Sequence, residues 1–178
     1  HVTDLEDMVS SLTASNIVIA TGAQPASPDH LSADGKRVIT YREAILQEDL
    51  PKSVVIVGGG AIGVEFATIW SSYGSQVTLV EMLPRILPME DEQISAELTK
   101  SFNKRGIKII TGAKVEHMVT ESQKVQVTIS AEKGVQSINA DQVLIAIGFV
   151  PNSDGLGLDD LGVECDNRGF IKVDARAR

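Results

Sequence analysis

The chain has 178 residues, of which 43% are hydrophobic and 22% charged, so it is long enough for one globular domain or one domain with pieces of a second. Its 16 basic and 24 acidic residues give a formal net charge of -8, which argues against binding to nucleic acid or to an anionic membrane surface. The single cysteine, Cys165, excludes an internal disulfide, a cysteine zinc site and an internal dithiol redox couple.

The hydropathy and the two chain termini indicate the cellular location of the protein and whether the chain is a fragment. No apolar run approaches the roughly 18 residues that a membrane span needs, and no secretory signal opens the chain. We therefore expect a soluble, cytoplasmic protein. Because the first residue is His1 and the last follows a strand-like stretch at 170–173, we also expect a fragment of a longer protein.

Short apolar runs bounded by turn-forming residues predict strands that are buried on both faces, as in parallel sheets. These runs are 17–20, 54–57, 77–80 and 143–146. Between the second and third, apolar residues three or four apart predict a helix with its stop at Gly74, and this apolar stripe consists of Ile62, Phe66, Ile69, Trp70 and Tyr73. Strand, helix and strand in this order predict a βαβ unit.

The second half of the chain changes its period. Residues 91–105 predict a helix, because Ile94, Leu98 and Phe102 recur every fourth residue and the charges follow the helix dipole. Alternation with a period of two then predicts an antiparallel β-meander over 115–120, 125–129 and 135–140. We interpret 21–52 as a connector with a short helix near 41–46. The expected fold is α/β, a Rossmann-like parallel sheet with helices and an antiparallel β-meander.

A glycine loop stands between the strand at 54–57 and the helix that follows it. Gly58, Gly60 and Gly63 form the pattern G-x-G-x-x-G in the strand-loop-helix context that a dinucleotide-binding fingerprint requires. In that fingerprint the first glycine permits the tight turn, the second lets the backbone approach a pyrophosphate, and the third lets the helix pack closely. The helix N-terminus then offers free N–H groups to the phosphates.

Two acidic residues extend this pattern. Glu81 lies 21 residues after Gly60, where the fingerprint expects an acid that accepts hydrogen bonds from the ribose, which favours NAD over NADP. Arg85 can in principle meet a 2′-phosphate, and a solvated strand-end acid is the plainer interpretation of Glu81. Glu65 either supports the helix dipole or contacts what lies against the nicotinamide.

Four motifs occur in order along the chain, at 20–22 (Ala-Thr-Gly), 57–67, 81–88 and 146–152. Together they resemble the flavin-dependent pyridine nucleotide-disulfide oxidoreductases, and among them the dihydrolipoamide dehydrogenases. The resemblance runs from about 15 to 173 and implies three parts. Residues 51–148 are expected to be the NAD-binding domain, 1–50 a flanking segment of the FAD domain with a connector, and 149–178 a return segment toward the FAD domain.

The resemblance also implies the roles of individual residues. Glu81 is expected to contact the adenosine ribose, Val115 and Gly148 to contact NAD, and Glu65 to match a glutamate that faces the flavin. The pyrophosphate and nicotinamide side of NAD is assigned to Gly58, Gly59, Gly60, Ala61, Ile62, Gly63, Val64 and Glu65, and the FAD side to Thr21, Gly22 and Ala23.

The activity implied by the resemblance is the oxidation of protein-bound dihydrolipoamide, with electrons passing through a disulfide and FAD to NAD. The partner is then the lipoyl-bearing acyltransferase component of a 2-oxoacid dehydrogenase complex, and the intact protein is expected to be a homodimer. The cysteine pair, the first FAD loop and the C-terminal His-Glu pair of the family fall outside residues 1–178, so we expect the fragment alone to be inactive.

Several alternatives stay open. Phe149 stands where many relatives carry Arg, so a mercuric reductase-like, glutathione reductase-like or NADH oxidase-like enzyme is one alternative. A stand-alone NAD-binding module without catalysis is a second alternative, and a glycine loop that binds FAD is a third.

Other conspicuous residues have plainer explanations. His30 and His117 have no His or Cys at ligand spacing, so no metal site is expected. The basic group Lys100, Lys104, Arg105 and Lys108 can attract an acidic partner, but helix-dipole stabilisation explains it more simply.

Overall fold

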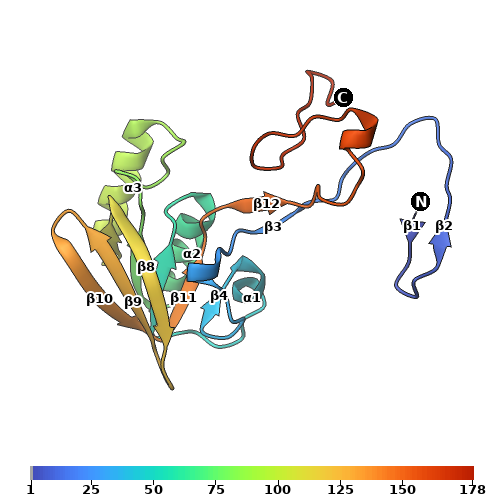
Figure 1. Ribbon diagram of the computed structural model, residues 1–178. Coiled ribbons are helices and arrows are strands. Elements are labelled where there is room, and N and C mark those ends of the chain that lie inside the picture. Colours follow the sequence, from blue (N-terminus) through green and yellow to red (C-terminus); the bar gives the residue numbers. More distant parts are fainter. Residues whose placement is uncertain (1) are drawn as a thin grey trace. The chain divides into compact units, whose positions relative to one another are not determined.

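The computed structural model describes residues 2–178, which form two compact units (Figure 1). The larger unit comprises residues 24–150, and the smaller one combines 2–23 with 151–178. The chain crosses between the units twice, at the short paired strands β3 (Ala23–Pro25) and β12 (Phe149–Pro151).

A five-stranded parallel sheet is the centre of the larger unit. Its order is β4-β11-β5-β6-β7, and the strands are β4 (Val38–Ile39), β5 (Ser53–Val57), β6 (Gln76–Val80), β7 (Lys108–Ile110) and β11 (Gln142–Ile145). Adjacent strands all run parallel. The strands predicted at 54–57, 77–80 and 143–146 are thereby confirmed, with the last displaced by one residue.

The helices begin and end where local signals place them. Helix α2 (Ala61–Ser72) ends just before Gly74, which has a φ of 100°. In α3 (Glu92–Lys104) the Asp91 side chain caps the N-terminus by accepting a hydrogen bond from the Gln93 N–H at 2.8 Å. The short α1 (Tyr41–Ile45) opens with a capping box between Thr40 and Glu43. All three predicted helices are confirmed.

The antiparallel meander is also confirmed. Its strands are β8 (Ala113–Thr120), β9 (Val125–Ala131) and β10 (Gly134–Ala140), in the order β10-β9-β8. A β-bulge between Val115 and His117 interrupts the register of β8 with β9.

The parallel sheet is buried on both faces, because alternate residues of its strands belong to two different cores. On one face Val54 and Ile56 pack with residues of the helices, among them Phe66 and Phe102. On the other face Val55 and Val57 pack with the meander residues Val115, Val125, Val127 and Ile129. The larger unit is therefore a sandwich of three layers: helices, parallel sheet and meander.

The smaller unit contains little regular structure. It has the hairpin of β1 (Val2–Thr3) with β2 (Val9–Ser10), a 3-10 turn η2 (Asp159–Leu161) and an isolated bridge between Cys165 and Ile171. The strand predicted at 17–20 is wrong: the segment has no regular structure, and Ile17 and Val18 are 81% and 87% exposed. No strand among residues 2–178 pairs with it, and an apolar segment without a neighbouring strand cannot form a ladder. The stretch 170–173 likewise forms only the single bridge.

Three further details correct the expectations from sequence. The connector also contributes the edge strand β4 to the parallel sheet, and it forms a 3-10 turn, η1 (Asp29–Leu31). Ile69 and Tyr73 on α2 and Ile94 on α3 are exposed, because the sheet covers a narrower stripe of each helix than the apolar pattern suggests. Of the residues described, no helix combines the length and apolarity required to cross a bilayer.

Candidate functional site

A cleft of about 570 Å³ lies inside the larger unit, at the carboxyl ends of its parallel strands. After β5 the chain passes through α2 to β6 and through α3 to β7, and it then crosses back through the meander to β11 on the opposite side of β5. Ligands of open α/β sheets bind outside the strand ends at such a switch point. The ends of β5, β6 and β11, the start of α2, the start of β8 and the turn η1 form the lining.

The glycine loop closes the gap between β5 and α2, and two of its glycines are required by close packing. Gly58 has a φ of 108°, in the left-handed region, and a Cβ there would overlap the carbonyl group of Ala146 at the end of β11. A Cβ on Gly63 would overlap the carbonyl oxygen of Gly58. The first and third glycines of the pattern therefore bring strand, loop and helix into contact.

Gly60 has a different role, because the absence of a side chain there leaves open space in the cleft. No atom lies within 4 Å of the position that a Cβ on Gly60 would occupy, and Gly60 lines the cleft. It is the N-cap of α2, and no side chain caps this helix terminus. The first N–H groups of α2 can therefore donate to a ligand, and a pyrophosphate in this open space fits both the free donors and the helix dipole.

Glu81 follows β6 and is only 8% exposed. Its Oε2 accepts a hydrogen bond from the Gly59 N–H at 2.6 Å, and its Oε1 accepts one from the Leu83 N–H at 2.8 Å. The plainer interpretation of a solvated strand-end acid is wrong, because this carboxylate is buried at the wall of the cleft. Each carboxylate oxygen keeps a second acceptor position, so ribose hydroxyl groups can still donate to it.

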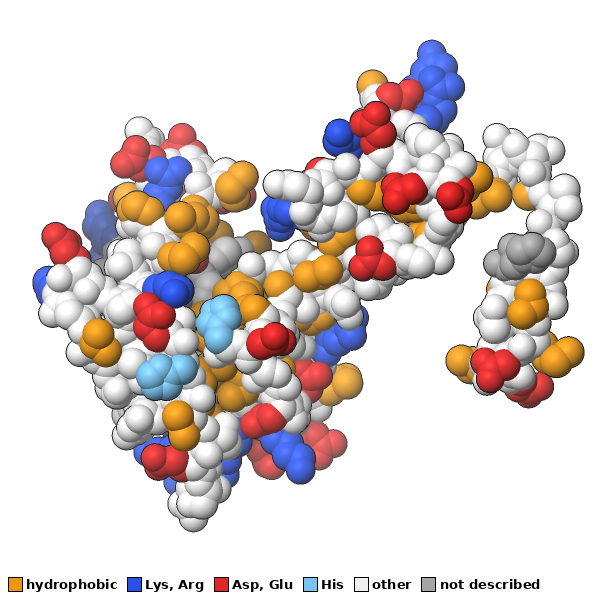
Figure 2. Space-filling model, in the orientation of Figure 1, with side chains coloured by type: hydrophobic (Ala, Val, Ile, Leu, Met, Phe, Trp, Pro, Cys, Tyr) orange, Lys and Arg blue, Asp and Glu red, His pale blue; other side chains and the backbone are white. Residues whose placement is uncertain are grey.

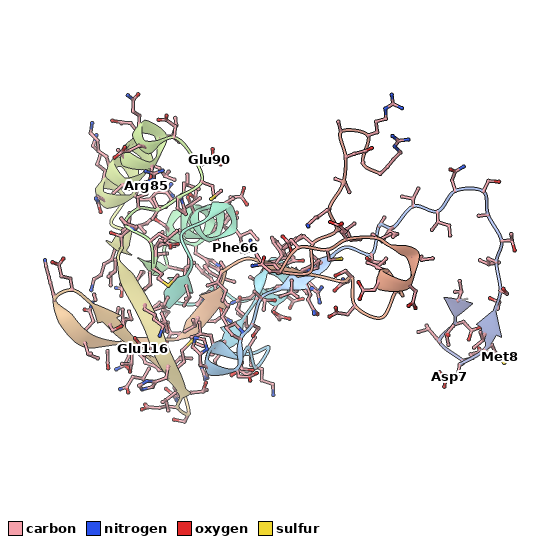
Figure 3. The ribbon with its side chains drawn as sticks, turned by 45° about the horizontal axis from the view of Figure 1, so that its top comes forward. Asp7, Met8, Phe66, Arg85, Glu90 and Glu116 are labelled. Atoms are coloured by element: carbon pink, nitrogen blue, oxygen red, sulfur yellow. The ribbon has the colours of Figure 1, made fainter. Side chains whose placement is uncertain are left out.

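Arg85 does not line this cleft. Its Nη2 donates to the carbonyl oxygens of Pro88 at 3.2 Å and Glu90 at 3.3 Å, and the side chain borders a separate groove along α3. Figure 3 shows Arg85 and Glu90 beside α3. The arginine that the sequence offers for a 2′-phosphate therefore has backbone partners elsewhere.

The structure brings most of the sequence-predicted cofactor residues to the cleft. Gly58, Gly60, Ala61, Ile62, Glu81, Val115 and Gly148 line it. Gly59 packs under Glu81, Gly63 packs on Gly58, and Val64 is buried in the helical core. Glu65 is an exposed residue in the second turn of α2 and does not line the cleft.

Sequence reasoning missed two basic residues of the cleft, His30 and Lys114. His30 belongs to η1 in the segment interpreted as a connector, and Lys114 is the neighbour of the predicted contact Val115. Leu31 of η1 joins the same core cluster as Val115, which fixes the turn on β8. Leu31, an apolar residue within a polar, proline-containing segment, is the local signal that could have indicated that this turn packs on the domain.

The residues predicted for the FAD side lie in the smaller unit. Within it, the Asn152 N–H donates to the Gly22 carbonyl oxygen and the Asn152 Nδ2 donates to the Thr21 carbonyl oxygen, both at 3.0 Å. Gly22 has a φ of 73°, and Ala23 begins β3. Two motifs that are 130 residues apart in sequence therefore meet through three hydrogen-bonding residues.

Other charged groups have structural partners. Arg105, from the basic group on α3, donates to the Thr68 carbonyl oxygen at 2.9 Å and to the Ser72 hydroxyl at 2.8 Å, which ties α3 to α2. Lys100 pairs with Glu97 at 3.5 Å. Within residues 2–178, no three His, Cys, Asp or Glu side chains are grouped as metal ligands.

Comparison with known proteins agrees with this arrangement. The family model for pyridine nucleotide-disulphide oxidoreductases matches residues 1–178. A dihydrolipoyl dehydrogenase of Chlorobaculum tepidum is 43% identical over 178 residues, which cover 99% of this chain and 38% of that relative. The chain thus spans little more than a third of the relative's length.

Two solved structures show the same fold. LpdA of Mycobacterium tuberculosis has a TM-score of 0.87 and 30% identity over 97% of this chain and 37% of its own. The HOCl-induced flavoprotein disulfide reductase RclA of Escherichia coli has a TM-score of 0.74 and 32% identity over 87% of this chain and 35% of its own. With its family model matched from end to end, the chain belongs to the pyridine nucleotide-disulphide oxidoreductase family.

Proposed function

We propose that this chain is the NAD-binding part of a flavoprotein that oxidises protein-bound dihydrolipoamide. The observation that carries the proposal is the position of Glu81, whose buried carboxylate lies in the wall of the cleft and contacts the glycine loop through Gly59. A carboxylate at this position, beside the free N–H groups of α2, supports the proposal because it can accept hydrogen bonds from ribose hydroxyl groups. The identity to a dihydrolipoyl dehydrogenase supports the substrate.

In this proposal each part of the cleft has one task. The backbone N–H groups at the start of α2 bind the pyrophosphate, and Gly60 provides the room for it. Glu81 holds the adenosine ribose, while Val115 and Gly148 contact the bound dinucleotide. Bound NAD would supply the hydride acceptor and FAD the electron relay, so the part of this chain is to bind and orient.

The choice of NAD over NADP follows from charge. A 2′-phosphate would add nearly two negative charges next to the Glu81 carboxylate, which costs free energy because both groups are then partly desolvated. Arg85 cannot compensate from its position, since its guanidinium donates to the carbonyl groups of Pro88 and Glu90. We therefore expect NADH to bind more tightly than NADPH.

Calorimetric titration of the full chain with NADH and NADPH tests both the site and the preference. Glu81→Gln should lower the ratio of NADH to NADPH affinity by about tenfold to a hundredfold, since hydrogen bonds to a charged group contribute about 1.5–3 kcal/mol. The ratio is the informative quantity, because loss of the bond to Gly59 alone would weaken both nucleotides alike.

Glu90→Gln is the matched control, because it removes an exposed carboxylate from the same segment outside the cleft. It should leave the ratio unchanged. Failure of the wild-type chain to bind either nucleotide would refute the proposed NAD site, and an unchanged ratio in Glu81→Gln would refute the ribose contact.

The remaining parts of the proposal concern the whole protein. We assign 51–148 to the NAD-binding domain and 1–50 and 149–178 to segments of the FAD domain, with Thr21, Gly22 and Ala23 on the flavin side and Glu65 facing the flavin. The proposed partner is a lipoyl-bearing acyltransferase, and the proposed assembly is a cytoplasmic homodimer.

A second candidate is another flavoprotein disulfide reductase, which the likeness to RclA favours. The two candidates share the nucleotide cleft and differ in the electron donor. Steady-state assays of the intact protein with free dihydrolipoamide and NAD separate them, because only the first candidate reduces NAD at the expense of this dithiol.

A further inference from the structure

The cleft has few ionisable side chains. Among the residues that line it, only Glu81, His30 and Lys114 carry ionisable groups. Lys114 is thus the one lining residue with a permanent positive charge, in a chain whose net charge is -8. A lysine in a cleft that receives phosphates is a candidate for a contact with the ligand, so its surroundings decide what it can do.

Backbone hydrogen bonds place Lys114 on the same wall as Glu81. The Ala113 N–H donates to the Glu81 carbonyl oxygen at 3.0 Å, the Gly112 N–H donates to the Leu83 carbonyl oxygen at 3.0 Å, and the Glu81 N–H donates to the Ile110 carbonyl oxygen at 2.8 Å. The start of β8 is therefore attached to the segment that carries the proposed ribose acceptor. Lys114 follows directly on this attachment.

The ammonium group of Lys114 already has a partner. Lys114 Nζ lies 3.0 Å from Glu116 Oε2, and the Ser130 hydroxyl donates to Glu116 Oε1 at 2.5 Å. The Ser130 hydroxyl, and after it Lys114, lower the pKa of the Glu116 carboxyl, so Glu116 is charged at neutral pH. Figure 3 shows Glu116 on the meander.

Glu116 lies at the β-bulge of β8. Lys114 faces Ser130, Val115 faces Ile129 and His117 faces Thr128, so Glu116 is the inserted residue. Such bulges redirect a side chain and occur often beside functional sites. His30 on η1 adds a favourable charge interaction with Glu116 when it is protonated.

We propose that Lys114 and Glu116 form a second determinant of the preference for NAD over NADP. In this proposal Glu116 neutralises Lys114, the one lysine lining the cleft that could bind a 2′-phosphate beside Glu81. This inference rests on the proposed NAD site. Glu81 repels the 2′-phosphate directly by its own charge, whereas Glu116 acts indirectly, by pairing with Lys114. Glu116 is thus a positioning residue, and Lys114 is the residue that meets the ligand.

The test releases the lysine without touching Glu81. Glu116→Gln keeps the size of the side chain and removes its charge, so Lys114 becomes available to NADPH. Because a partly exposed ion pair contributes up to about 1 kcal/mol, we expect NADPH to bind about fivefold more tightly while NADH changes less than about twofold. Calorimetric titration of the full chain with both nucleotides at low ionic strength measures this, and the gain should shrink at high salt.

Two further variants keep the test sharp. In Lys114→Gln combined with Glu116→Gln the gain for NADPH should disappear, because the cation that produces it is gone. Glu164→Gln is the matched control: it removes one carboxylate from a similar exposed pair, Glu164 with Lys172 at 3.1 Å, in the smaller unit. It changes the net charge by the same amount and should change neither affinity.

The outcomes separate this inference from the proposed function. If Glu116→Gln alters NADH and NADPH alike, matches Glu164→Gln, or retains its gain in the double variant, the role of the pair is refuted while the NAD site stands. If the wild-type chain binds neither nucleotide, the proposed function itself fails.

Discussion

Two glycines of the G-x-G-x-x-G pattern, Gly60 and Gly63, provide a test with opposite results, because they are glycine for different reasons. At Gly60 a Cβ would meet no atom within 4 Å and would occupy the open space of the cleft. At Gly63 a Cβ would lie inside 3.0 Å of the Gly58 carbonyl oxygen, a separation that Cβ atoms do not adopt. Alanine at the first position should therefore obstruct the ligand, and alanine at the second should disturb the fold.

The backbone of Gly60 allows an estimate for its variant. Its φ of -75° and ψ of -171° are accessible to alanine. The lower entropy of the unfolded chain stabilises Gly60→Ala by about 0.4–1 kcal/mol, and the poorer N-cap costs a similar amount, so the free energy of unfolding should change by less than about 1 kcal/mol. NADH affinity should fall at least about tenfold, because the methyl group keeps the pyrophosphate from the N–H groups of α2.

Gly63→Ala should show the reverse balance. The new methyl group must displace the loop from α2, and overpacking of this kind costs about 1–3 kcal/mol of stability. Binding should fall as well, because Gly58 and the loop move together. Urea unfolding and calorimetric titration with NADH measure the two quantities for both variants. A Gly60→Ala chain that binds NADH with wild-type affinity would refute the assignment of the pyrophosphate to this loop.

Three other predictions concern the scaffold. Arg37→Met should lower the free energy of unfolding by about 1–2 kcal/mol in urea, because its guanidinium donates to three carbonyl oxygens, those of Ser122, Gln123 and Asp141, and so fixes the connector to the meander. The Ser53 hydroxyl lowers the pKa of the Asp141 carboxyl below its ordinary value of 3.8, so the charged carboxylate stabilises the fold above that pH and this contribution is lost as the pH falls further. Asp141→Asn should therefore be less stable than wild type at pH 7 and lose less stability on acidification. An unchanged dependence of stability on acid pH would contradict this. Tyr73→Ser should leave stability within about 0.5 kcal/mol of wild type, because this side chain is 73% exposed despite its place in the apolar pattern.

Much of the site could be predicted because its signals are local. Gly58 and Gly63 are required by contacts with the adjoining strand and helix, Gly60 provides open space at the helix N-terminus, and the 21-residue spacing to Glu81 corresponds to one helix, one turn and one strand. Strand pairing across β5 and β6 then brings Glu81 to the loop. The N-cap of α3 at Asp91 is equally local, as is the period of two in the meander.

The sequence by itself therefore determined the α/β class, the helix ends, the meander and the glycine loop with its acid. Only the tertiary structure decided which side of the loop each polar group occupies: Arg85 turns to carbonyl groups outside the cleft, while Lys114 and His30 come to it from β8 and η1. The apolar run at 17–20 showed the same limit, since a strand needs a neighbour and none of residues 2–178 pairs with it. Periodicity and spacing act over one or two elements, whereas exposure and long-range contacts depend on how distant elements pack.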